Sequence, residues 1–237
     1  MLRLHVDPPL SVCPQLDLPP GAARHAQVRR VQPGDDLILF DGRGGEWRAR
    51  VLAMGRQSVQ VEVLAYEAVD RELPLDVTLA VGMPANERMD WLVEKATELG
   101  AARLQPLHCE RAVLRLDGER AERKREHWQS QAVAAAEQCG RTRPPEVLPV
   151  RRLGDWLAAG GLPATRWLLS PTAAVPPAAP STDTGVVVLS GPEGGLSPAE
   201  EAAARQAGFV AVQLGPRVLR AETAPLALLA WLGLGRQ

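Results

Sequence analysis

The stretch that most constrains the fold is residues 186–200, which join an apolar run to a glycine-rich turn. The run Val-Val-Val-Leu lacks alternation with polar residues, which is typical of a strand buried on both faces of a parallel sheet. Gly191, Gly194 and Gly195 follow it, and glycine permits positive φ and close approach of a ligand to bare backbone N–H groups. Pro192 stiffens the turn by fixing φ. The pattern predicts a strand followed by a loop that can receive a ligand.

A helix start closes this loop, and a second stretch repeats the arrangement. Ser197 and Glu200 have the spacing of a capping box, with Pro198 at the first helical position. Residues 210–225 again run from an apolar strand through a Gly-Pro loop to a helix start, for which Thr223 is the predicted N-cap. Ligands of open α/β sheets bind beyond the carboxyl ends of the strands. Two such loops therefore predict one site at that edge.

The loops do not carry a common nucleotide-binding motif. The GPEGG segment lacks the glycine spacing of a dinucleotide fingerprint, and no Walker lysine and serine follow the glycines. Residues before the loops show neither an HExxH motif nor a nucleophile paired with a base. A nicotinamide or nucleotide enzyme is disfavoured on this ground.

The order of predicted elements indicates two domains. Short strands at residues 2–6, 37–40, 47–54 and 58–64, with a helix near residues 23–31, predict a small β-barrel over residues 1–70. Beyond a linker near residues 67–74, strands alternate with helices, which predicts an α/β domain over residues 75–237. The elements expected there are strands 75–81, 103–108 and 166–169 and helices 87–99 and 117–139.

Composition limits the partners and the compartment. The 237 residues carry a formal net charge of −1, so any nucleic-acid surface must be local. The three cysteines are widely spaced and include no CxxC pair, so neither a disulfide framework nor a zinc site is predicted, and a reducing cytoplasm fits. No apolar run approaches the length of a membrane span.

Motifs spread along the chain resemble one known family. The segments GPEGGLSPAE at 191–200 and LGPRVLRAETAPLALL at 214–229 are similar to the signature of the bacterial 16S ribosomal RNA uridine N3-methyltransferases. EKATELG at 94–100, Glu110-Arg111 and AAEQCGR at 135–141 extend the similarity in the same order. The resemblance implies an α/β domain of the trefoil-knotted SPOUT type, with a parallel sheet, preceded by a PUA-like RNA-binding β-barrel. Within this pattern Ala221 replaces a common threonine and Pro225 a common alanine.

The resemblance also implies a cofactor and the residues that bind it. The cofactor is S-adenosylmethionine, held bent by the two loops and by the loop at Ser170, with no metal required. The residues expected to bind it are Ser170, Leu189, Ser190, Gly191, Pro192, Glu193, Gly194, Leu214, Gly215, Val218, Leu219 and Thr223.

Methylation of uracil N3 requires removal of a proton and stabilisation of the charge that develops on the ring. Arg220 is expected to stabilise the charge on a uracil oxygen. Glu193 or Glu222 is expected to orient the ring or to take the proton, and the choice between them stays open.

Arginines are the candidates for contact with 16S ribosomal RNA in the small ribosomal subunit. Residues 141–152 hold four arginines against one acid, and Arg111 and Arg115 lie on one side if their segment is helical. The expected RNA contacts are Arg24, Arg29, Arg30, Arg111, Arg115, Arg141 and Arg143. A non-catalytic RNA-binding protein of ribosome assembly stays the alternative function.

The C-terminal segment 226–232 is apolar on every side. A helix of this kind must be buried all round. At a chain end this predicts packing against a second subunit, and hence a homodimer formed through the C-terminal helix.

Overall fold

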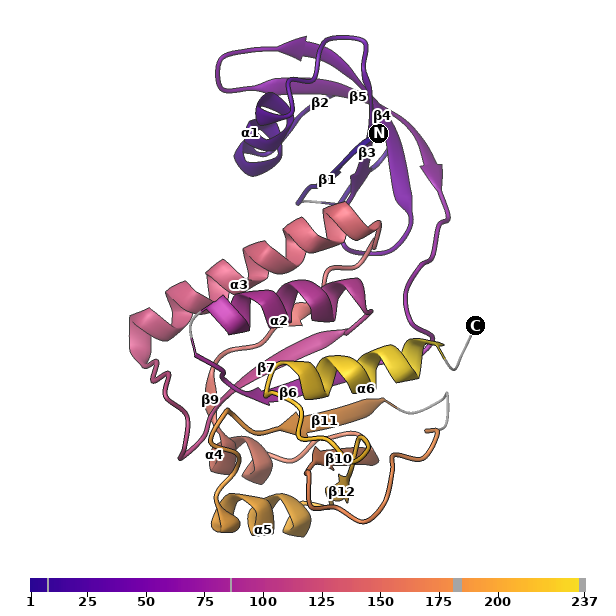
Figure 1. The fold of residues 1–237 in the computed structure, drawn as a ribbon. Helices are drawn as coiled ribbons and strands as arrows, with labels where there is room; N and C mark the ends of the chain where they lie inside the picture. Colours follow the sequence, from indigo (N-terminus) through magenta and orange to yellow (C-terminus); the bar gives the residue numbers. More distant parts are fainter. Residues whose placement is uncertain (8, 86, 181–184, 235–237) are drawn as a thin grey trace. The chain divides into compact units, whose positions relative to one another are not determined.

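The computed structural model describes residues 1–7, 9–85, 87–180 and 185–234, and the chain divides into two compact units (Figure 1). The N-terminal unit is Met1–Glu72 with Ala136–Pro144, and the C-terminal unit is Leu73–Ala135 with Pro145–Gln237. The sequence-based limits, residues 1–70 and 75–237, stay a prediction. The units differ from them in placing residues 136–144 with the first.

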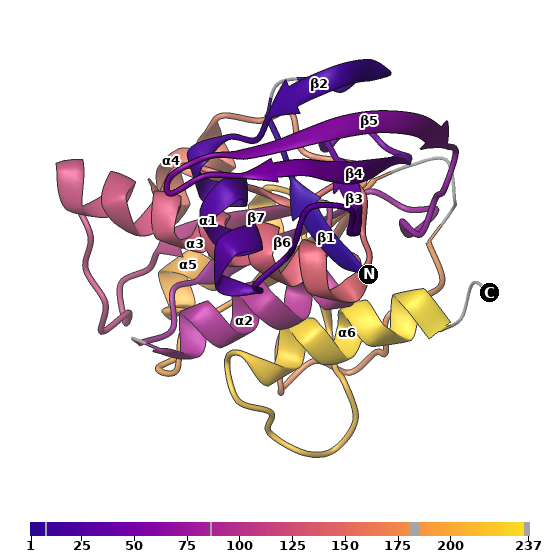
Figure 2. The same cartoon turned by 90° about the horizontal axis from the view of Figure 1, so that it is seen from above.

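The N-terminal unit is a five-stranded mixed sheet with one helix. Its strands follow the order β1-β3-β4-β5-β2, in which β1 pairs parallel with β3 and the other pairs are antiparallel (Figure 2). Small residues of α1 pack with alternate residues of the strands to form the core. The elements are β1 (Leu2–His5), β2 (Cys13–Asp17), α1 (Pro20–Val28), β3 (Asp36–Phe40), β4 (Glu46–Met54) and β5 (Val59–Glu67).

Sequence prediction missed β2. Its second residue, Pro14, cannot donate a ladder hydrogen bond, so the segment does not read as a strand. The structure places β2 at the edge of the sheet, beside β5, and an edge strand tolerates proline.

The C-terminal unit is a parallel sheet covered by helices on both faces. The strand order is β12-β10-β11-β6-β7-β8, and the short β9 also pairs with β7. Its elements are β6 (Val77–Gly82), α2 (Glu87–Glu98), β7 (Arg103–His108), α3 (Gly118–Cys139), β8 (Glu146–Val147), β9 (Arg151–Arg152), α4 (Leu153–Ala158), β10 (Thr165–Leu169), β11 (Val186–Ser190), α5 (Pro198–Gln206), β12 (Val210–Val212) and α6 (Thr223–Leu234).

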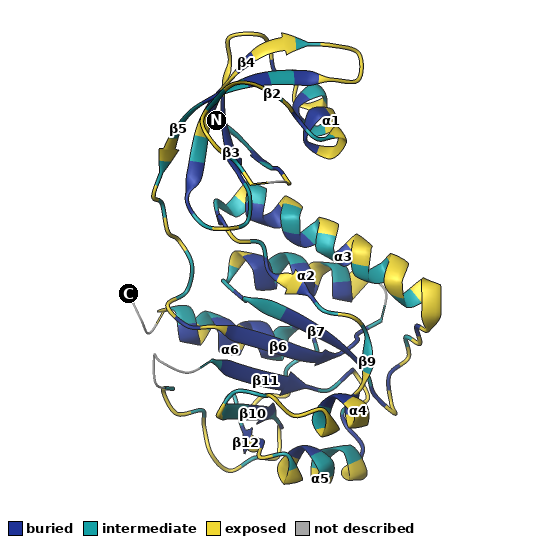
Figure 3. Ribbon diagram, turned by 180° about the vertical axis from the view of Figure 1, so that it is seen from behind, coloured by how far each residue is buried: buried dark blue, intermediate teal, exposed yellow. Residues whose placement is uncertain are grey.

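Two apolar cores explain why the sheet strands lack polar alternation. Val186 and Val188 face a core built with α2, α3 and α6, whereas Val187 and Leu189 face a second core built with α4 and α5. The central strands β6 and β11 are accordingly buried along their length (Figure 3). This confirms the predicted α/β domain with a parallel sheet. The trefoil knot stays a prediction.

Helix α6 corrects the expectation of a helix buried all round. Leu226, Leu228, Leu229 and Leu232 are buried within the chain itself, whereas Trp231 is 42% exposed. The helix therefore presents one inner face to the sheet. In addition, α6 begins at Thr223, so this residue opens the helix and does not precede it.

No helix in the described part of the chain is long and apolar enough to cross a membrane.

Candidate cofactor site

A cavity of about 450 Å³ lies where β10, β11 and β12 end, in the C-terminal unit. These strands are neighbours in the sheet and run parallel, so their carboxyl ends open at the same edge. The volume of the cavity lies within the range of cavities that hold small molecules. The lining residues are Arg88, Leu168, Leu169, Ser170, Pro171, Ser190, Gly191, Pro192, Glu193, Gly195, Leu196, Glu201, Val212, Gln213, Leu214, Gly215, Arg217, Val218, Leu219, Arg220, Ala221 and Ala224.

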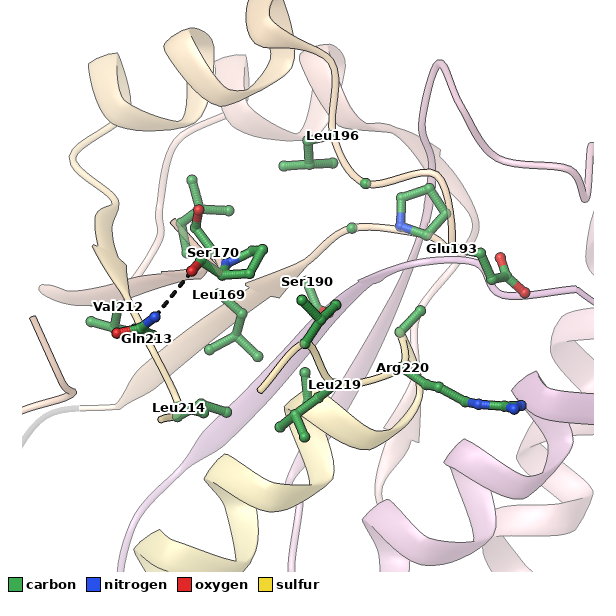
Figure 4. Close-up of a pocket in the computed structure, with 18 of the residues that line it drawn as sticks. Leu169, Ser170, Ser190, Glu193, Leu196, Val212, Gln213, Leu214, Leu219 and Arg220 are labelled. Carbon is green, nitrogen blue, oxygen red and sulfur yellow. Dashed lines mark hydrogen bonds between the residues drawn. The ribbon is translucent and has the colours of Figure 1, made fainter. Parts of the chain in front are cut away.

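The two ends of the cavity differ in chemistry. Apolar residues from β10, β12 and the loop after β12 form one end, where the Gln213 side-chain amide donates to Pro171 O at 3.0 Å (Figure 4). Glu193 and Arg220 lie at the opposite end (Figure 4). One molecule that fills this cavity would therefore meet an apolar, backbone-lined end and a charged end.

We call residues 191–196, which follow β11, the glycine loop. A Cβ at Gly191 would lie 2.9 Å from Leu196 N and 3.1 Å from Gly195 C, which are atoms of the loop itself. A Cβ at Gly194 would lie 3.0 Å from the Cβ of Arg111. In the sequence, these glycines predict close approach of a ligand to the backbone. In the structure, packing of the loop on itself and on its neighbour already requires them.

Glu193 connects the glycine loop to the segment before α2. Its Oε1 accepts hydrogen bonds from Ala85 N at 2.9 Å and from Arg88 Nη1 at 3.1 Å. Partial burial acts to raise the pKa of Glu193, but these hydrogen bonds and the Arg88 charge bring it below its ordinary value. The group is therefore an anion at neutral pH.

Arg111 holds the other side of the glycine loop. Its Nη1 lies 3.3 Å from both Gly194 O and Leu196 O, so one guanidinium nitrogen is shared between two carbonyls. The segment between β7 and α3 is not helical. The condition under which Arg111 and Arg115 would lie on one side of a helix is therefore not met.

The predicted capping box is confirmed at the start of α5. Ser197 Oγ accepts from Glu200 N, and Glu200 Oε2 accepts from Ser197 N at 2.9 Å. Glu200 Oε1 also accepts from Glu110 N at 2.8 Å, which ties this helix start to the segment after β7. The end of the glycine loop is thus fixed by local and distant contacts together.

We call residues 213–222, between β12 and α6, the C-terminal loop. Gly215 has φ +82°, and the backbone O of Arg220 accepts from Thr223 N and Ala224 N at 3.0 Å each, which joins the loop to α6. Val218 at its tip is 83% exposed. The loop covers the cavity from the side opposite the glycine loop, with much of its own surface exposed.

Most residues predicted to bind the cofactor are brought together at the cavity. Those that line it are Ser170, Ser190, Gly191, Pro192, Glu193, Leu214, Gly215, Val218 and Leu219. Leu189, Gly194 and Thr223 do not line it. Leu189 faces the core with α4 and α5, and Gly194 lies against Arg111.

The predicted catalytic residues fall in three different environments. Arg220 lines the cavity and is exposed, and within the described residues its guanidinium has no side-chain partner. Glu193 also lines the cavity, but its carboxylate is bound by Ala85 and Arg88. Glu222 is 7% exposed and does not line the cavity, and its Oε2 has no hydrogen-bond partner among the described residues.

Sequence reasoning missed four polar residues of the cavity: Arg88, Glu201, Gln213 and Arg217. Arg88 is one position inside α2, where it reads as an ordinary exposed helix residue. Its only sequence signal is its place just after the carboxyl end of β6, beside the strand that leads to the glycine loop.

The arginines predicted to contact RNA are divided between the units. Arg24, Arg29 and Arg30 are exposed on or just after α1, and Arg30 has φ 57°. Arg115 is exposed in the C-terminal unit. These four side chains are accessible to a large ligand.

Residues 141 and 143, in the N-terminal unit, have different surroundings. Arg141 is 5% exposed, and its Nε donates to Glu72 Oε2 at 2.8 Å. Arg143 is exposed, with Nη1 4.0 Å from Asp70 Oδ2. The guanidinium of Arg141 therefore serves an internal ion pair.

In the described ranges, no group of three or more His, Cys, Asp or Glu side chains is placed to hold a metal ion.

Comparison with known proteins identifies the family. Residues 71–233 match the model of an RNA methyltransferase domain, and residues 18–64 match that of an RNA methyltransferase PUA domain. The chain belongs to the RNA methyltransferase family. The first match spans the α/β unit with its cavity, and the second lies within the five-stranded sheet unit. The resemblance stated from the motifs is thereby confirmed.

Relatives of this RNA methyltransferase family cover most of the chain. A Ribosomal RNA small subunit methyltransferase E of Bacillus subtilis is 33% identical over 209 residues, which are 84% of this chain and 81% of the relative. A crystal structure of the protein of that name from Neisseria gonorrhoeae, bound to S-adenosylmethionine, has 38% identity and a TM-score of 0.91. It covers 98% of this chain, which in turn covers 96% of it.

A second family member with a bound cofactor has nearly the same fold. The structure of a methyltransferase from Legionella pneumophila, in complex with S-adenosylmethionine, is 31% identical to this chain with a TM-score of 0.92. The alignment covers 99% of this chain and 97% of that one.

Proposed function

We propose that this protein transfers a methyl group from S-adenosylmethionine to N3 of a uridine in 16S ribosomal RNA of the small ribosomal subunit. The observation that carries the proposal is the cavity at the ends of β10, β11 and β12, in a chain whose fold matches a methyltransferase bound to S-adenosylmethionine. The enzyme class rests on the RNA methyltransferase domain, and the ribosomal target on the names of the relatives.

The cavity suits S-adenosylmethionine by shape and by chemistry. The adenine would lie at the apolar end, near Leu214 and Leu219, where backbone groups can pair with its ring edges. The sulfonium methyl would face the charged end. The proposed binding residues are the predicted ones that line the cavity other than Glu193, whose carboxylate is bound by Ala85 and Arg88, together with Gln213.

The proposed reaction is an in-line displacement in which positioning supplies much of the rate. When bound, the cofactor supplies an electrophilic methyl group: the bond from sulfur to carbon breaks as the bond from N3 to carbon forms. Arg220 is proposed to stabilise the negative charge of a uracil oxygen, because this residue lines the charged end of the cavity. The N3 proton passes to solvent, since Glu193 is bound by two donors and Glu222 lies off the cavity.

RNA contact is proposed for the exposed arginines on both units. Arg24, Arg29 and Arg30 in the N-terminal unit, within the part that matches a PUA domain, offer guanidinium groups to phosphates. Arg115 and Arg143 are proposed for the same role. Arg141 is instead proposed to hold residues 136–144 in the N-terminal unit through Glu72.

A homodimer is proposed to form through the outer face of α6. Ala227, Trp231 and Leu234 are exposed at helical spacings of four and three, so they share one face. Trp91 of the adjoining α2 is 46% exposed. An apolar surface of this kind suits a second copy of the chain. Sedimentation at the mass of a monomer at micromolar concentration would contradict the homodimer.

The cytoplasm is the proposed compartment.

The test is an incubation of the full chain with labelled S-adenosylmethionine and either 30S subunits or naked 16S RNA that lacks the modification. Label in the RNA, mapped to N3 of a uridine, is expected. RNA binding without label transfer would instead support the non-catalytic assembly protein. Label at another atom or in another RNA would reject the stated target.

A further inference from the structure

The side chain of Glu193, which lines the cavity, is bound by the segment that leads into α2. Its Oε1 accepts from Ala85 N at 2.9 Å and from Arg88 Nη1 at 3.1 Å, and the side chain is 26% exposed. Ala85 lies two residues before Glu87, the first residue of α2, and Arg88 is the second residue of that helix. The Glu193 carboxylate is therefore bound close to the N-terminal end of α2, where the helix dipole favours an anion.

Close packing accompanies this contact. A Cβ at Gly82, the last residue of β6, would lie 2.5 Å from Pro192 Cδ and 2.7 Å from Pro192 N. The glycine loop thus rests directly on the end of β6, one residue before Glu193 reaches the segment before α2. Pro192 and Glu193, which are consecutive in the loop, are therefore both held against residues 82–85.

The fixed part of the loop is also a wall of the cavity. Gly191, Pro192 and Glu193 all line it. A shift of this backbone would change the space available to the cofactor. The close packing described earlier between Gly191 and Leu196 means that such a shift would pass along the whole loop.

We propose that Glu193 is a positioning residue, whose carboxylate latches the glycine loop to the segment before α2 and so holds the cofactor cavity in its binding shape. The inference rests on the proposed function for the identity of the cofactor. It assigns Glu193 a role through Ala85 and Arg88 and none in proton transfer. The lowered pKa of Glu193 agrees with this role, because an efficient general base has a pKa near the working pH.

Two substitutions at this position separate the roles. Glu193→Gln keeps a carbonyl oxygen that can accept from Ala85 N, whereas Glu193→Ala removes the acceptor. Calorimetry with S-adenosylmethionine on the full-length enzyme is expected to show Kd raised about 10-fold or more in Glu193→Ala, since a hydrogen bond to a charged group is lost. Glu193→Gln should stay within about 3-fold of wild type in both Kd and kcat.

The matched control is Glu87→Gln, which removes an exposed carboxylate from the first turn of α2 at a position that does not line the cavity. It is expected to leave Kd unchanged. Wild-type Kd in Glu193→Ala would overturn the latch. So would loss of kcat in Glu193→Gln at unchanged Kd, because that pattern belongs to a proton acceptor.

A second variant protects the test against misfolding. If Glu193→Ala loses its cooperative thermal transition, Arg88→Ala removes one donor of the latch and leaves the carboxylate in place. It is expected to raise the Kd for S-adenosylmethionine about 3-fold, and the same Kd as wild type would overturn the proposal. The Kd measurements use the free protein and cofactor, without RNA. Absence of methyl transfer to 16S RNA would thus reject the proposed function while leaving the latch to be judged by Kd.

Discussion

The glycine loop and the C-terminal loop face each other across one cavity, yet they are held in different ways. The glycine loop is bonded to distant parts of the chain: its own Glu193 accepts from Ala85 and Arg88, and Arg111 donates to two of its carbonyls. The C-terminal loop is joined to α6 through the Arg220 carbonyl and leaves Val218 exposed. One wall of the site is preorganised by the chain, and the other has more freedom.

This difference suggests that the two loops have different roles, one toward the cofactor and the other toward the RNA substrate. A wall that is rigid before the ligand arrives loses little conformational entropy on binding, so it suits the cofactor. A more exposed loop, whose Arg220 guanidinium has no side-chain partner in the described part of the chain, suits contact with the RNA substrate, which arrives from solvent. Substitutions in the two loops are therefore expected to alter different kinetic constants.

The largest expected effect comes from the C-terminal loop. Arg220→Ala removes the guanidinium at the charged end of the cavity, and loss of such a charge-stabilising donor lowers kcat about 100- to 1,000-fold. The Kd for S-adenosylmethionine should change little, because the apolar end and the glycine loop are untouched. Methyl transfer to 30S subunits measures the first quantity, and calorimetry the second. If kcat and the affinity for S-adenosylmethionine fell equally, Arg220 would be a structural residue. The proposed difference in role between the two loops would then be wrong.

A smaller effect is expected from the glycine loop. Gly191→Val brings a branched side chain against Leu196 N and Gly195 C, which are backbone atoms that cannot move aside without reshaping the loop. The Kd for S-adenosylmethionine should rise about 100-fold, equivalent to about 2.7 kcal/mol. Calorimetry on the folded variant tests this, with the thermal transition as a check of folding.

The comparison with the other loop is made with Gly215→Ala. A Cβ at Gly215 meets open space, so the cost is that of a positive φ in a non-glycine residue, about 1 kcal/mol. A rise in Kd of at most about 5-fold is expected. A loss as large as that of Gly191→Val would show that both loops are equally constrained.

Sequence reasoning succeeded where the physical cause is local. The buried strand from Val186 and the capping box of Ser197 and Glu200 depend on residues within a few positions of one another, and both are confirmed. The latch of Glu193 could not be read in this way, because its partner Ala85 lies 108 positions earlier. Only the fold brings the ends of β6 and β11 together.

The same reason accounts for the mixed result at the arginines. The sequence shows which residues are charged but not which are buried. Arg141 is therefore predicted to belong to a basic surface, although it is 5% exposed and paired with Glu72. Arg88 reads as an ordinary helix residue although it lines the cavity. In both cases the deciding contact is to a residue far away in the sequence.

A similarly modest effect separates two arginines of the connection between β7 and α3. Arg111 shares its guanidinium between the carbonyls of Gly194 and Leu196, whereas no contact of Arg115 with the loop is found in the part of the chain that the structure describes. Arg111→Ala should therefore raise KM for S-adenosylmethionine about 3- to 10-fold, because the free energy lost is that of one or two modest hydrogen bonds. The KM for 30S subunits should change little.

Arg115→Ala should give the reverse pattern. Because a phosphate contact releases counterions, its loss weakens RNA binding and reduces the salt dependence of log K by about one. The KM for S-adenosylmethionine should stay at the wild-type value. If Arg111→Ala instead shifts KM for 30S subunits and its salt dependence, Arg111 belongs to the RNA surface. The preorganised wall would then depend on Glu193 and the packing of its own glycines.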